Sequence, residues 1–458
     1  MTQICLLGFA CFLCPGSYNA VNGLGGGGQV DATTSANANV ALHLTSAVGG
    51  FLAGQVNLTR TTEQTHSYCF VSRSIVNSIG PKLTLQLGSF GYCLFVGSYL
   101  AINIHPNTGA FVIVAGAILG FCAALLWAAQ GALMLAYPTE AEKGKFIAVF
   151  WAIFNMGGVV GAAVSLGQNF HSKAGSVNNG TYIGFMVLTA IGILVPWFMA
   201  DPKNMTRTDG TKVTVSAHPA WKVQLRNLWV TLITDPMILL LFPMFFCSNW
   251  FYTWQFNDYN GAIFTIRARS LNNFVYWTAQ IVGSLLVSLL LDFKWLSRRA
   301  RAFSGWILLL TMVLTTHIWG YFYQREYTRE SASKSIDIYD TQYIGKVWLY
   351  IFFGLLDAMW QSAAYWYMGA MSNDVGKLAY FVGFYKSIQS AGAAGVWRAD
   401  AVGTPYLNIF ISTWALLVTG LIFALPVLYL RIKNYTENAV VSDEDERVEE
   451  TDSIKRAV

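Results

Sequence analysis

The stretch Ala110–Ala136, AFVIVAGAILGFCAALLWAAQGALMLA, contains no charged residue, and its most polar side chain is Gln130. A helix needs about 20 predominantly apolar residues to cross the hydrocarbon core of a bilayer. Inside hydrocarbon the backbone N–H and C=O groups of such a stretch are satisfied within the segment itself, which favours a helix. The stretch therefore predicts a membrane-spanning helix.

The composition of the whole chain points the same way. Of its 458 residues, 54% are hydrophobic and only 12% are charged, whereas soluble domains carry about 25% charged residues. The mean hydropathy is +0.44. These values exclude a cytosolic enzyme and predict a polytopic membrane protein whose main partner is the lipid bilayer. The net charge of +5 is modest and follows the loops, so no nucleic-acid partner is predicted.

Apolar stretches recur along the chain, and no alternating ten-residue pattern of membrane barrel strands accompanies them. The predicted fold class is therefore all-α. The expected spans are 3–21, 36–54, 83–104, 110–136, 146–167, 182–200, 236–256, 274–291, 303–323, 345–371, 378–397 and 406–430. The predicted domains are an N-terminal six-helix bundle over 1–200, a central cytoplasmic loop over 201–235, a C-terminal six-helix bundle over 236–430 and a disordered acidic tail over 431–458.

The Lys and Arg residues of the loops predict the orientation. With both termini inside, roughly twice as many of these residues lie on the cytoplasmic side as outside, in agreement with the positive-inside rule. We therefore expect both termini in the cytoplasm, of either the plasma membrane or an endomembrane. The outer sequon makes Asn179 the glycosylation candidate, and modification of Asn204 instead would contradict this topology.

A polar segment, 55–73, separates the second expected span from the third. When it is skipped, Gly54, Asn77, Gly80 and Lys82 adopt the spacing G-x-x-x-[D/N]-x-x-G-x-[K/R]. This spacing resembles the signature loop of the major facilitator superfamily and implies a cytoplasmic gate loop, although Asn77 replaces the acidic residue of that signature. Two hypotheses stay open: the segment is an insertion in the gate loop, or it belongs to a genuine long loop.

Longer stretches resemble a particular branch of this superfamily. They are NGLGGGGQVD (22–31), YPTEAEKGKFIAVFW (137–151), NMGGVVGA (155–162), FYTWQFNDYNGAIF (251–264), RSLNN (269–273), LDAMWQ (356–361) and FVGFYKSIQSAGAAGVWRADAVG (381–403). Together they look like the Unc-93-like family of ion channel regulatory proteins. The resemblance implies a major facilitator fold of twelve transmembrane helices in two six-helix pseudo-symmetric bundles. It also implies relatives that act as regulatory or trafficking partners of channels and receptors.

Two ionisable residues stand out within expected spans, Asp357 in the tenth and Lys386 in the eleventh. A charged side chain at a helix centre costs about 2.5–3.5 kcal/mol on insertion scales, so such residues are candidates for a functional site. Gln361 is one turn from Asp357 and Gln389 is three residues after Lys386, which gives each charge an amide on its own helix face. Either the two charges form an ion pair, or Lys386 extends to the inner interface and Asp357 faces a watery cavity alone.

In the first half, Gln130 and Asn155 are the corresponding candidates for a polar path. The alternative for each of them is a hydrogen bond that joins two helices, which is the commoner role of an amide in a membrane.

The sequence shows no nucleophile–base arrangement and no convincing metal spacing. The run Gly25–Gly28 lacks the G-K-[ST] ending of a phosphate-binding loop and is expected to be a flexible or helix-ending outer loop. We therefore predict a non-enzyme without cofactor or metal. The leading hypothesis is a facilitator-type secondary transporter that moves an unknown small solute or ion by alternating access. In one version of this hypothesis, transport is coupled to protons through Asp357. The alternative is a non-transporting subunit that binds a channel or receptor.

Overall fold

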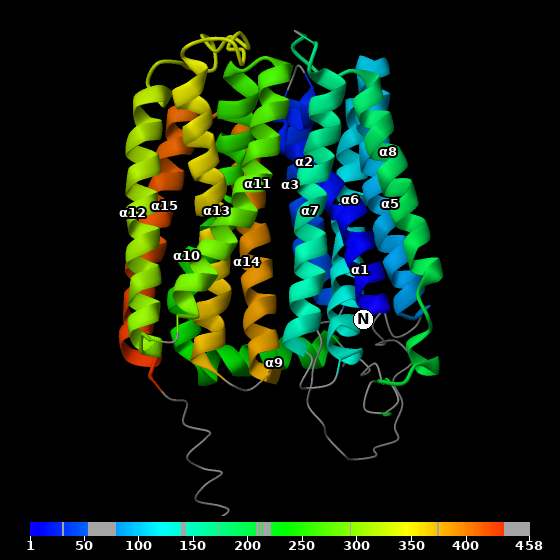
Figure 1. Ribbon diagram of the computed structural model, residues 1–458, viewed down its shortest axis with the longest axis vertical. Helices are drawn as coiled ribbons and strands as arrows, with labels where there is room; N and C mark the ends of the chain where they lie inside the picture. The colour runs from blue at the N-terminus through cyan, green and yellow to red at the C-terminus, as the bar shows by residue number, and fades with distance from the viewer. Residues whose placement is uncertain are drawn as a thin grey trace, which may run out of the picture.

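The computed structural model describes residues 1–29, 32–53, 79–138, 143–172, 174–207, 210, 213, 221–293, 295–372 and 375–434 (Figure 1). Long helices make up most of this part of the chain, and its strand-like features are single bridge residues, such as the pair Phe264 and Ile336. The all-α prediction is confirmed. The segment 55–73 and most of the acidic tail lie outside the described residues, so the hypotheses about them stay predictions.

The N-terminal bundle is the blue-to-green half of Figure 1. Its first span consists of two helices, α1 and α2, which meet at Cys14, where Pro15 begins the second helix. Proline is tolerated at a first helical position because its missing N–H has no partner there. The helices are α1 (Thr2–Leu13), α2 (Pro15–Gly23), α3 (Thr33–Ala53), α5 (Pro81–Ile104), α6 (Gly109–Ala136), α7 (Lys143–Asn169) and α8 (Asn179–Leu194).

The C-terminal bundle is the green-to-red half. Its first span, 236–261, is irregular: a 3-10 turn (Pro236–Leu241), the short helix α10 (Phe242–Phe246), a second 3-10 turn (Cys247–Asn249) and a π-helix (Thr253–Gly261). The remaining helices are α11 (Ile266–Leu291), α12 (Arg298–Gln324), α13 (Tyr343–Met371), α14 (Val375–Ala401) and α15 (Tyr406–Pro426), which continues as a π-turn (Val427–Arg431).

Ten of the spans are long and apolar enough to cross a membrane by length and composition alone. The helices α3 and α14 complete the set of twelve, although their sequences are more polar. Both lie between the bundles, where α3 packs on α14, while α7 packs on α11. A helix that faces another helix needs fewer apolar residues than one that faces lipid. The predicted twelve-helix architecture is confirmed.

The lipid-facing surface explains the apolar composition. Leu285 and Leu289 on α11, and Ile183 and Val187 on α8, are all at least half exposed. In water such continuous apolar stripes would be unfavourable. In a bilayer the lipid chains cover them.

Two regions differ from the sequence-based expectation. The central stretch 201–235, expected as a loop, contains a helix, α9 (Trp221–Thr234). The spans also extend further at one end than expected: the seventh continues to Gly261, the eighth begins at Ile266, and the eleventh continues to Ala401. Many of the added residues are polar, and several of them form hydrogen bonds between the bundles, as Asn260 and Arg269 do.

The two ends of the molecule are distinct. The N-terminus, α9 and the end of α15 lie at the lower end in Figure 1, which we call the terminal end. The opposite end carries Gly25–Gly28 after α2 and the connection between α12 and α13. We call it the lock end, because side chains there hold the two bundles together. The first and the last described residues, Met1 and Asn434, thus lie on one side, as an even number of crossings requires. That this side is cytoplasmic stays a prediction.

Close helix crossings depend on small residues, as in membrane bundles generally. A Cβ atom added to Gly120 of α6 would lie 2.1 Å from the carbonyl oxygen of Leu42 and from Oγ1 of Thr45 on α3. We expect Gly120→Ala to destabilise the protein by about 1–3 kcal/mol, as overpacking does elsewhere, and to lower the melting temperature of the detergent-solubilised protein. The control is Gly167→Ala, because nothing lies within 4 Å of that position. Equal melting temperatures for the two variants would contradict the prediction.

Candidate functional site

The carboxylate of Asp357 on α13 is the centre of a buried polar cluster. Its residue is 1% exposed. Oδ2 lies 3.0 Å from the hydroxyl of Tyr276 and accepts a hydrogen bond from Gln280, both on α11. Oδ1 accepts from Nε2 of Gln361, one turn along α13, at 2.8 Å. Hydrogen bonds to the charged form are what makes a buried carboxylate tolerable.

The cluster continues from Asp357 to Lys386 through two amides. Nε2 of Gln389 lies 3.4 Å from Oε1 of Gln361 and 2.9 Å from Oδ1 of Asn249. Oε1 of Gln389 in turn accepts from Nζ of Lys386 at 2.9 Å. The sequence left open a direct ion pair between Asp357 and Lys386, or an Asp357 alone in a watery cavity. The structure shows a third arrangement. The charges are linked through Gln361 and Gln389 without direct contact, and Asp357 does not face water alone.

The end of this chain at Lys386 faces the other bundle. Ala393 and Trp397 of α14 pack against Ala36 of α3, and Lys386 lies on the same helix face as Ala393 because seven residues make about two turns. Lys386 is exposed. Its ammonium group therefore lies on the surface of α14 that faces the N-terminal bundle, toward the terminal end from that contact.

Asn155 occupies the matching place on α7. Gly158, one turn away, contacts Trp277 of α11, so Asn155 lies on the face toward the C-terminal bundle, and it is exposed. With a rise of about 1.5 Å per residue, Asn155 and Lys386 lie at similar depths, roughly 17 Å from the beginnings of their helices. Both helices begin at the terminal end (Figure 1).

The remaining predicted residues lie elsewhere. Gln130 is buried in α6, and no described hydrogen bond joins it to the Asp357 cluster. In the predicted gate loop, Gly80 precedes the first residue of α5 and has a φ of 81°, and Nζ of Lys82 donates to the carbonyl of Trp197 at 3.3 Å. Gly54 and Asn77 lie outside the described residues.

The glycosylation candidate Asn179 begins α8 and is exposed. Its Oδ1 accepts a hydrogen bond from Asn103 at 2.7 Å. Its modification stays a prediction.

A second polar cluster, at the lock end, joins the two bundles. Arg269 of α11 is 1% exposed, and no acidic side chain is among its hydrogen-bond partners in the described part of the chain. Instead it donates to three carbonyl oxygens of the N-terminal bundle: Nε to Leu24 at 2.7 Å, Nη2 to Gly25 at 2.6 Å and Nη1 to Gly175 at 2.9 Å. A planar guanidinium suits several fixed acceptors of this kind.

The glycine run provides these acceptors by approaching the C-terminal bundle very closely. Gly25 has a φ of 75°, and a Cβ atom there would lie 2.2 Å from the carbonyl oxygen of Phe256. Only glycine fits such a position without strain. Of the two alternatives, a flexible or a helix-ending loop, the structure shows the second: α2 ends at Gly23, and Gly26–Gly28 form a buried 3-10 turn.

Three asparagines of the C-terminal bundle extend this contact. Asn273 donates to the carbonyl of Ala20 at 2.6 Å, and Asn260 donates to that of Gly23 at 2.8 Å. Oδ1 of Asn257 accepts the backbone N–H of Gly26 at 2.6 Å. We call these residues, together with Arg269 and Gly25–Gly28, the lock.

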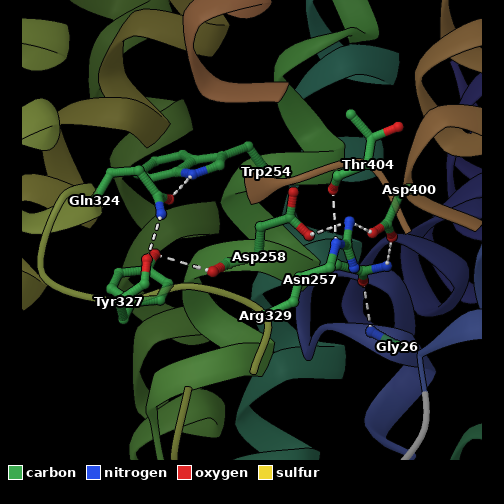
Figure 2. A network of polar contacts seen from close by, with 9 residues as sticks. All are labelled: Gly26, Trp254, Asn257, Asp258, Gln324, Tyr327, Arg329, Asp400 and Thr404. Atoms are coloured by element: carbon green, nitrogen blue, oxygen red, sulfur yellow. Dashed lines mark hydrogen bonds and ion pairs between the residues drawn. The ribbon is translucent and has the colours of Figure 1, made fainter. Parts of the chain in front are cut away.

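Figure 2 shows what holds Asn257 in place. Its Nδ2 donates to Oδ2 of Asp400 on α14 at 2.7 Å. Oδ1 of Asp400 accepts from Nη2 of Arg329, in the connection between α12 and α13, at 2.5 Å. Burial alone would lower the pKa of Arg329, but the carboxylates of Asp258 and Asp400 outweigh it and raise the pKa.

Sequence reasoning missed the residues of the lock. The expected spans end too early, so they leave Asn257, Asp258 and Arg269 in an outer loop. They also leave Asp400 beyond the eleventh span. A signal was nevertheless present. Each of these residues lies in a stretch that carries the family resemblance: 22–31, 251–264, 269–273 and 381–403. These four stretches meet at the lock.

An ion pair near the lock belongs to the C-terminal bundle alone. Nε and Nη2 of Arg267 donate to the two carboxylate oxygens of Asp337 at 3.1 and 2.5 Å. Burial alone would raise the pKa of Asp337, but hydrogen bonds from Arg267 and Thr265 outweigh it, so the pKa is lowered.

This lowered pKa implies a pH-dependent stability. A carboxyl with a lower pKa in the folded state stabilises the protein above its unfolded pKa, about 4, and loses that contribution as the pH falls through the folded value. We expect Asp337→Asn to reduce stability at neutral pH by about 1.5–3 kcal/mol and to be less sensitive to strong acid than the wild type. Thermal unfolding in detergent, followed by tryptophan fluorescence, measures this. An unchanged melting temperature at neutral pH would contradict it.

The two clusters consist of charged and amide side chains that hold one another, or backbone carbonyls, by hydrogen bonds. Within the described ranges, no group of three or more His, Cys, Asp or Glu residues has a geometry that holds a metal ion. The Asp357 cluster offers a buried negative charge, amides and tyrosine hydroxyls to a solute or ion. The lock is a set of buried hydrogen bonds between the bundles.

Comparison with known proteins identifies relatives over most of the chain. The family model for the ion channel regulatory protein UNC-93 matches residues 61–428. An UNC93-like protein of Schizosaccharomyces pombe is 46% identical over 441 residues, which covers 95% of this chain and 84% of the relative. UNC93-like protein 1 of Arabidopsis thaliana is 38% identical over 454 residues, with 98% and 93% covered.

Among solved structures, a D-xylose-proton symporter superposes with a TM-score of 0.62 over 95% of this chain and 98% of the other, at 13% sequence identity. The xylose transporter XylE from E. coli, in a partially occluded inward-open conformation, gives a TM-score of 0.58, with 94% and 97% covered, at 12% identity. At such low identity the likeness establishes the fold, which is that of the major facilitator superfamily.

Proposed function

The chain belongs to the Unc-93-like family and has a major facilitator fold, and from this premise we propose that it is a secondary transporter that moves a small solute or ion by alternating access. The observation that carries the proposal is the Asp357 cluster. A buried carboxylate is linked through Gln361 and Gln389 to Lys386, which is exposed between the bundles. A solute that enters from the terminal end meets this path.

The lock supports the same proposal. It joins the bundles at the lock end, through buried hydrogen bonds to backbone carbonyls, while polar residues are exposed between the bundles nearer the other end. This is the arrangement expected of a transporter that is closed at the lock end. The alternating step then consists of breaking the lock and closing the terminal end.

We further propose that Asp357 binds the coupling proton. In an apolar environment the ionised carboxylate is stable only while its donors stay in place. A solute that displaces Gln361 or Gln280 from Asp357 changes the balance between the charged and the neutral form. Solute binding and proton binding are thereby linked at one residue. The solved relative of the same fold that is named a proton symporter gives this form of coupling a precedent in the fold.

Two measurements test the proposal. Spin labels on the two bundles at the lock end are expected to show two distances in nanodiscs, whereas a fixed scaffold shows one. Proteoliposomes that contain a pH-sensitive dye are expected to acidify or alkalise when pooled sugars, amino acids or alkali cations are added outside. A single distance together with no flux from any pool would contradict transport.

A second candidate function follows from the family's description as ion channel regulatory proteins. In this form the chain binds a channel or receptor subunit and moves no solute. It predicts a stable partner in cross-linking mass spectrometry of native membranes and no flux in vesicles that contain the chain alone.

A further inference from the structure

Asp258 stands out among the buried charged groups of the molecule. It lies in the π-helix that ends the seventh span, and it is 0% exposed. Within the part of the chain that the structure describes, neither of its carboxylate oxygens has a hydrogen-bond partner. The nearest cationic atom, Nη2 of Arg329, lies 3.8 Å from Oδ1. The backbone carbonyl of Asp258 is occupied separately, by the hydroxyl of Tyr327 at 2.9 Å.

Its neighbour Asp400 is in the opposite situation. Both oxygens of Asp400 are hydrogen-bonded, one to Arg329 at 2.5 Å and the other to Asn257 at 2.7 Å (Figure 2). Asp258 also interacts electrostatically with Asp400. Two buried carboxylates therefore share a single guanidinium, and only one of them is well solvated by the protein.

Elementary electrostatics decides the charge state of this pair. A buried carboxylate without hydrogen bonds is far less stable as an anion than in water. A second negative charge beside it adds repulsion, and one arginine neutralises only one of the two. The closed arrangement is therefore balanced when Asp400 is ionised and Asp258 carries a proton.

We propose that Asp258, with Asp400 and Arg329, is a proton-binding site that is separate from Asp357 and that controls the lock. In the closed state Asp258 holds a proton. When the lock opens, water reaches the site, the carboxyl of Asp258 ionises, and its proton leaves to the compartment at the lock end. The site therefore takes up one proton each time the lock closes.

The path from this site to the lock is short. Asp400 fixes the amide of Asn257 by accepting from its Nδ2, and this orientation points Oδ1 at the backbone N–H of Gly26 in the other bundle. If Asp258 ionises, it competes with Asp400 for Arg329. Asp400 then loses its own neutralising partner, and the bond that orients Asn257 weakens.

Other titratable groups lie near Asp258, but none of them replaces it as the group that binds the proton. The ring of Tyr406 on α15 stacks under Arg329 at 4.3 Å. The other titratable and charged side chains near it are Glu326, Tyr327, Glu330 and Arg398. Burial raises the pKa of Tyr327 far above the range of interest. Glu330 and Arg398 are exposed and hydrated.

Because the closed state binds the additional proton, acid is expected to favour it. The experiment uses the full chain in nanodiscs, with spin labels introduced as unnatural amino acids at the exposed lock-end positions Asn107 and Ser333. The fraction of molecules with the short distance is measured as the pH is lowered. In the wild type this fraction is expected to rise.

The variants identify the group. Asp258→Asn imitates the protonated acid, so its short-distance fraction is expected to stay high and not to change with pH. Asp400→Asn leaves Asp258 alone with Arg329, which favours its ionised form, so the midpoint is expected to move to lower pH by about one unit or more. The matched control is Glu330→Gln, which removes an exposed acid beside Arg329 and should respond as the wild type does.

The proposal fails if the wild-type distances do not change with pH, or if Asp258→Asn keeps the wild-type response. Should Asp258→Asn not fold, Asp400→Asn decides, and an unchanged midpoint overturns the proposal. The inference rests on the proposed alternating access, but the two fail separately. A pH-dependent lock without flux contradicts transport alone, whereas flux with a pH-independent lock contradicts only the site at Asp258.

Discussion

Asp357→Asn is expected to reduce solute or ion flux in reconstituted vesicles by about ten- to a hundredfold, since hydrogen bonds to a charged group contribute about 1.5–3 kcal/mol each. The substitution keeps the shape of the side chain but removes its charge. It also replaces one acceptor oxygen by an NH₂ group, which then faces donors of Gln361, Gln280 or Tyr276. Binding of a cation or proton at this position is lost.

Folding is expected to survive this change, because an amide costs less to bury than a charge. The melting temperature of the purified variant is therefore measured beside its flux. The control is Glu330→Gln, an equivalent loss of charge at an exposed position. Asp357→Asn with wild-type flux would remove Asp357 from the transport mechanism, and equal losses in both variants would point to a general electrostatic effect.

Arg269→Lys is expected to open the lock. The guanidinium reaches three carbonyls of the N-terminal bundle, those of Leu24, Gly25 and Gly175. An ammonium group is a compact charge that does not span all three. Loss of one charged hydrogen bond, about 1.5–3 kcal/mol, changes the ratio of locked to unlocked molecules by about ten- to a hundredfold.

The measurement is again the distance between labels at Asn107 and Ser333, which should lengthen in the variant. Arg267→Lys is a close control, because Arg267 lies two residues away on the same helix but pairs with Asp337 inside its own bundle. It should lower stability without changing the distance between the bundles. A variant Arg269→Lys that keeps the wild-type distance would show that the lock does not depend on this side chain.

The membrane architecture was predictable because the bilayer acts on composition directly. A stretch such as 110–136 has one favourable environment, whatever its neighbours are. The predicted ends of the spans were inaccurate where helices face each other. The expected spans stopped at 256, began at 274 and ended at 397, because the following or preceding residues, among them Asn257, Arg269 and Asp400, are polar. A prediction from hydropathy places such polar residues in loops outside the membrane.

In the candidate sites too, some residues were predictable from the sequence and others only from helix packing. Asp357 was found because an acidic residue within an apolar helix is visible in the sequence, and its amide Gln361 follows from helical spacing. That Gln280 and Tyr276 complete the cluster depends on how α11 packs on α13, which no local pattern encodes. The contacts of Arg269 are even harder to predict from the sequence, because its partners are backbone carbonyls, which every residue has.

The sequence alone determined that this chain crosses a membrane in two six-helix halves, because the transfer of apolar side chains out of water depends on each segment separately. It also determined the family, through the stretches around Gly25, Asp258, Arg269 and Asp400. Only the tertiary structure decided what those stretches do together. A buried charge is stable only where its hydrogen-bond partners converge, and the partners of Arg269 and Asp400 come from segments that are far apart in the chain.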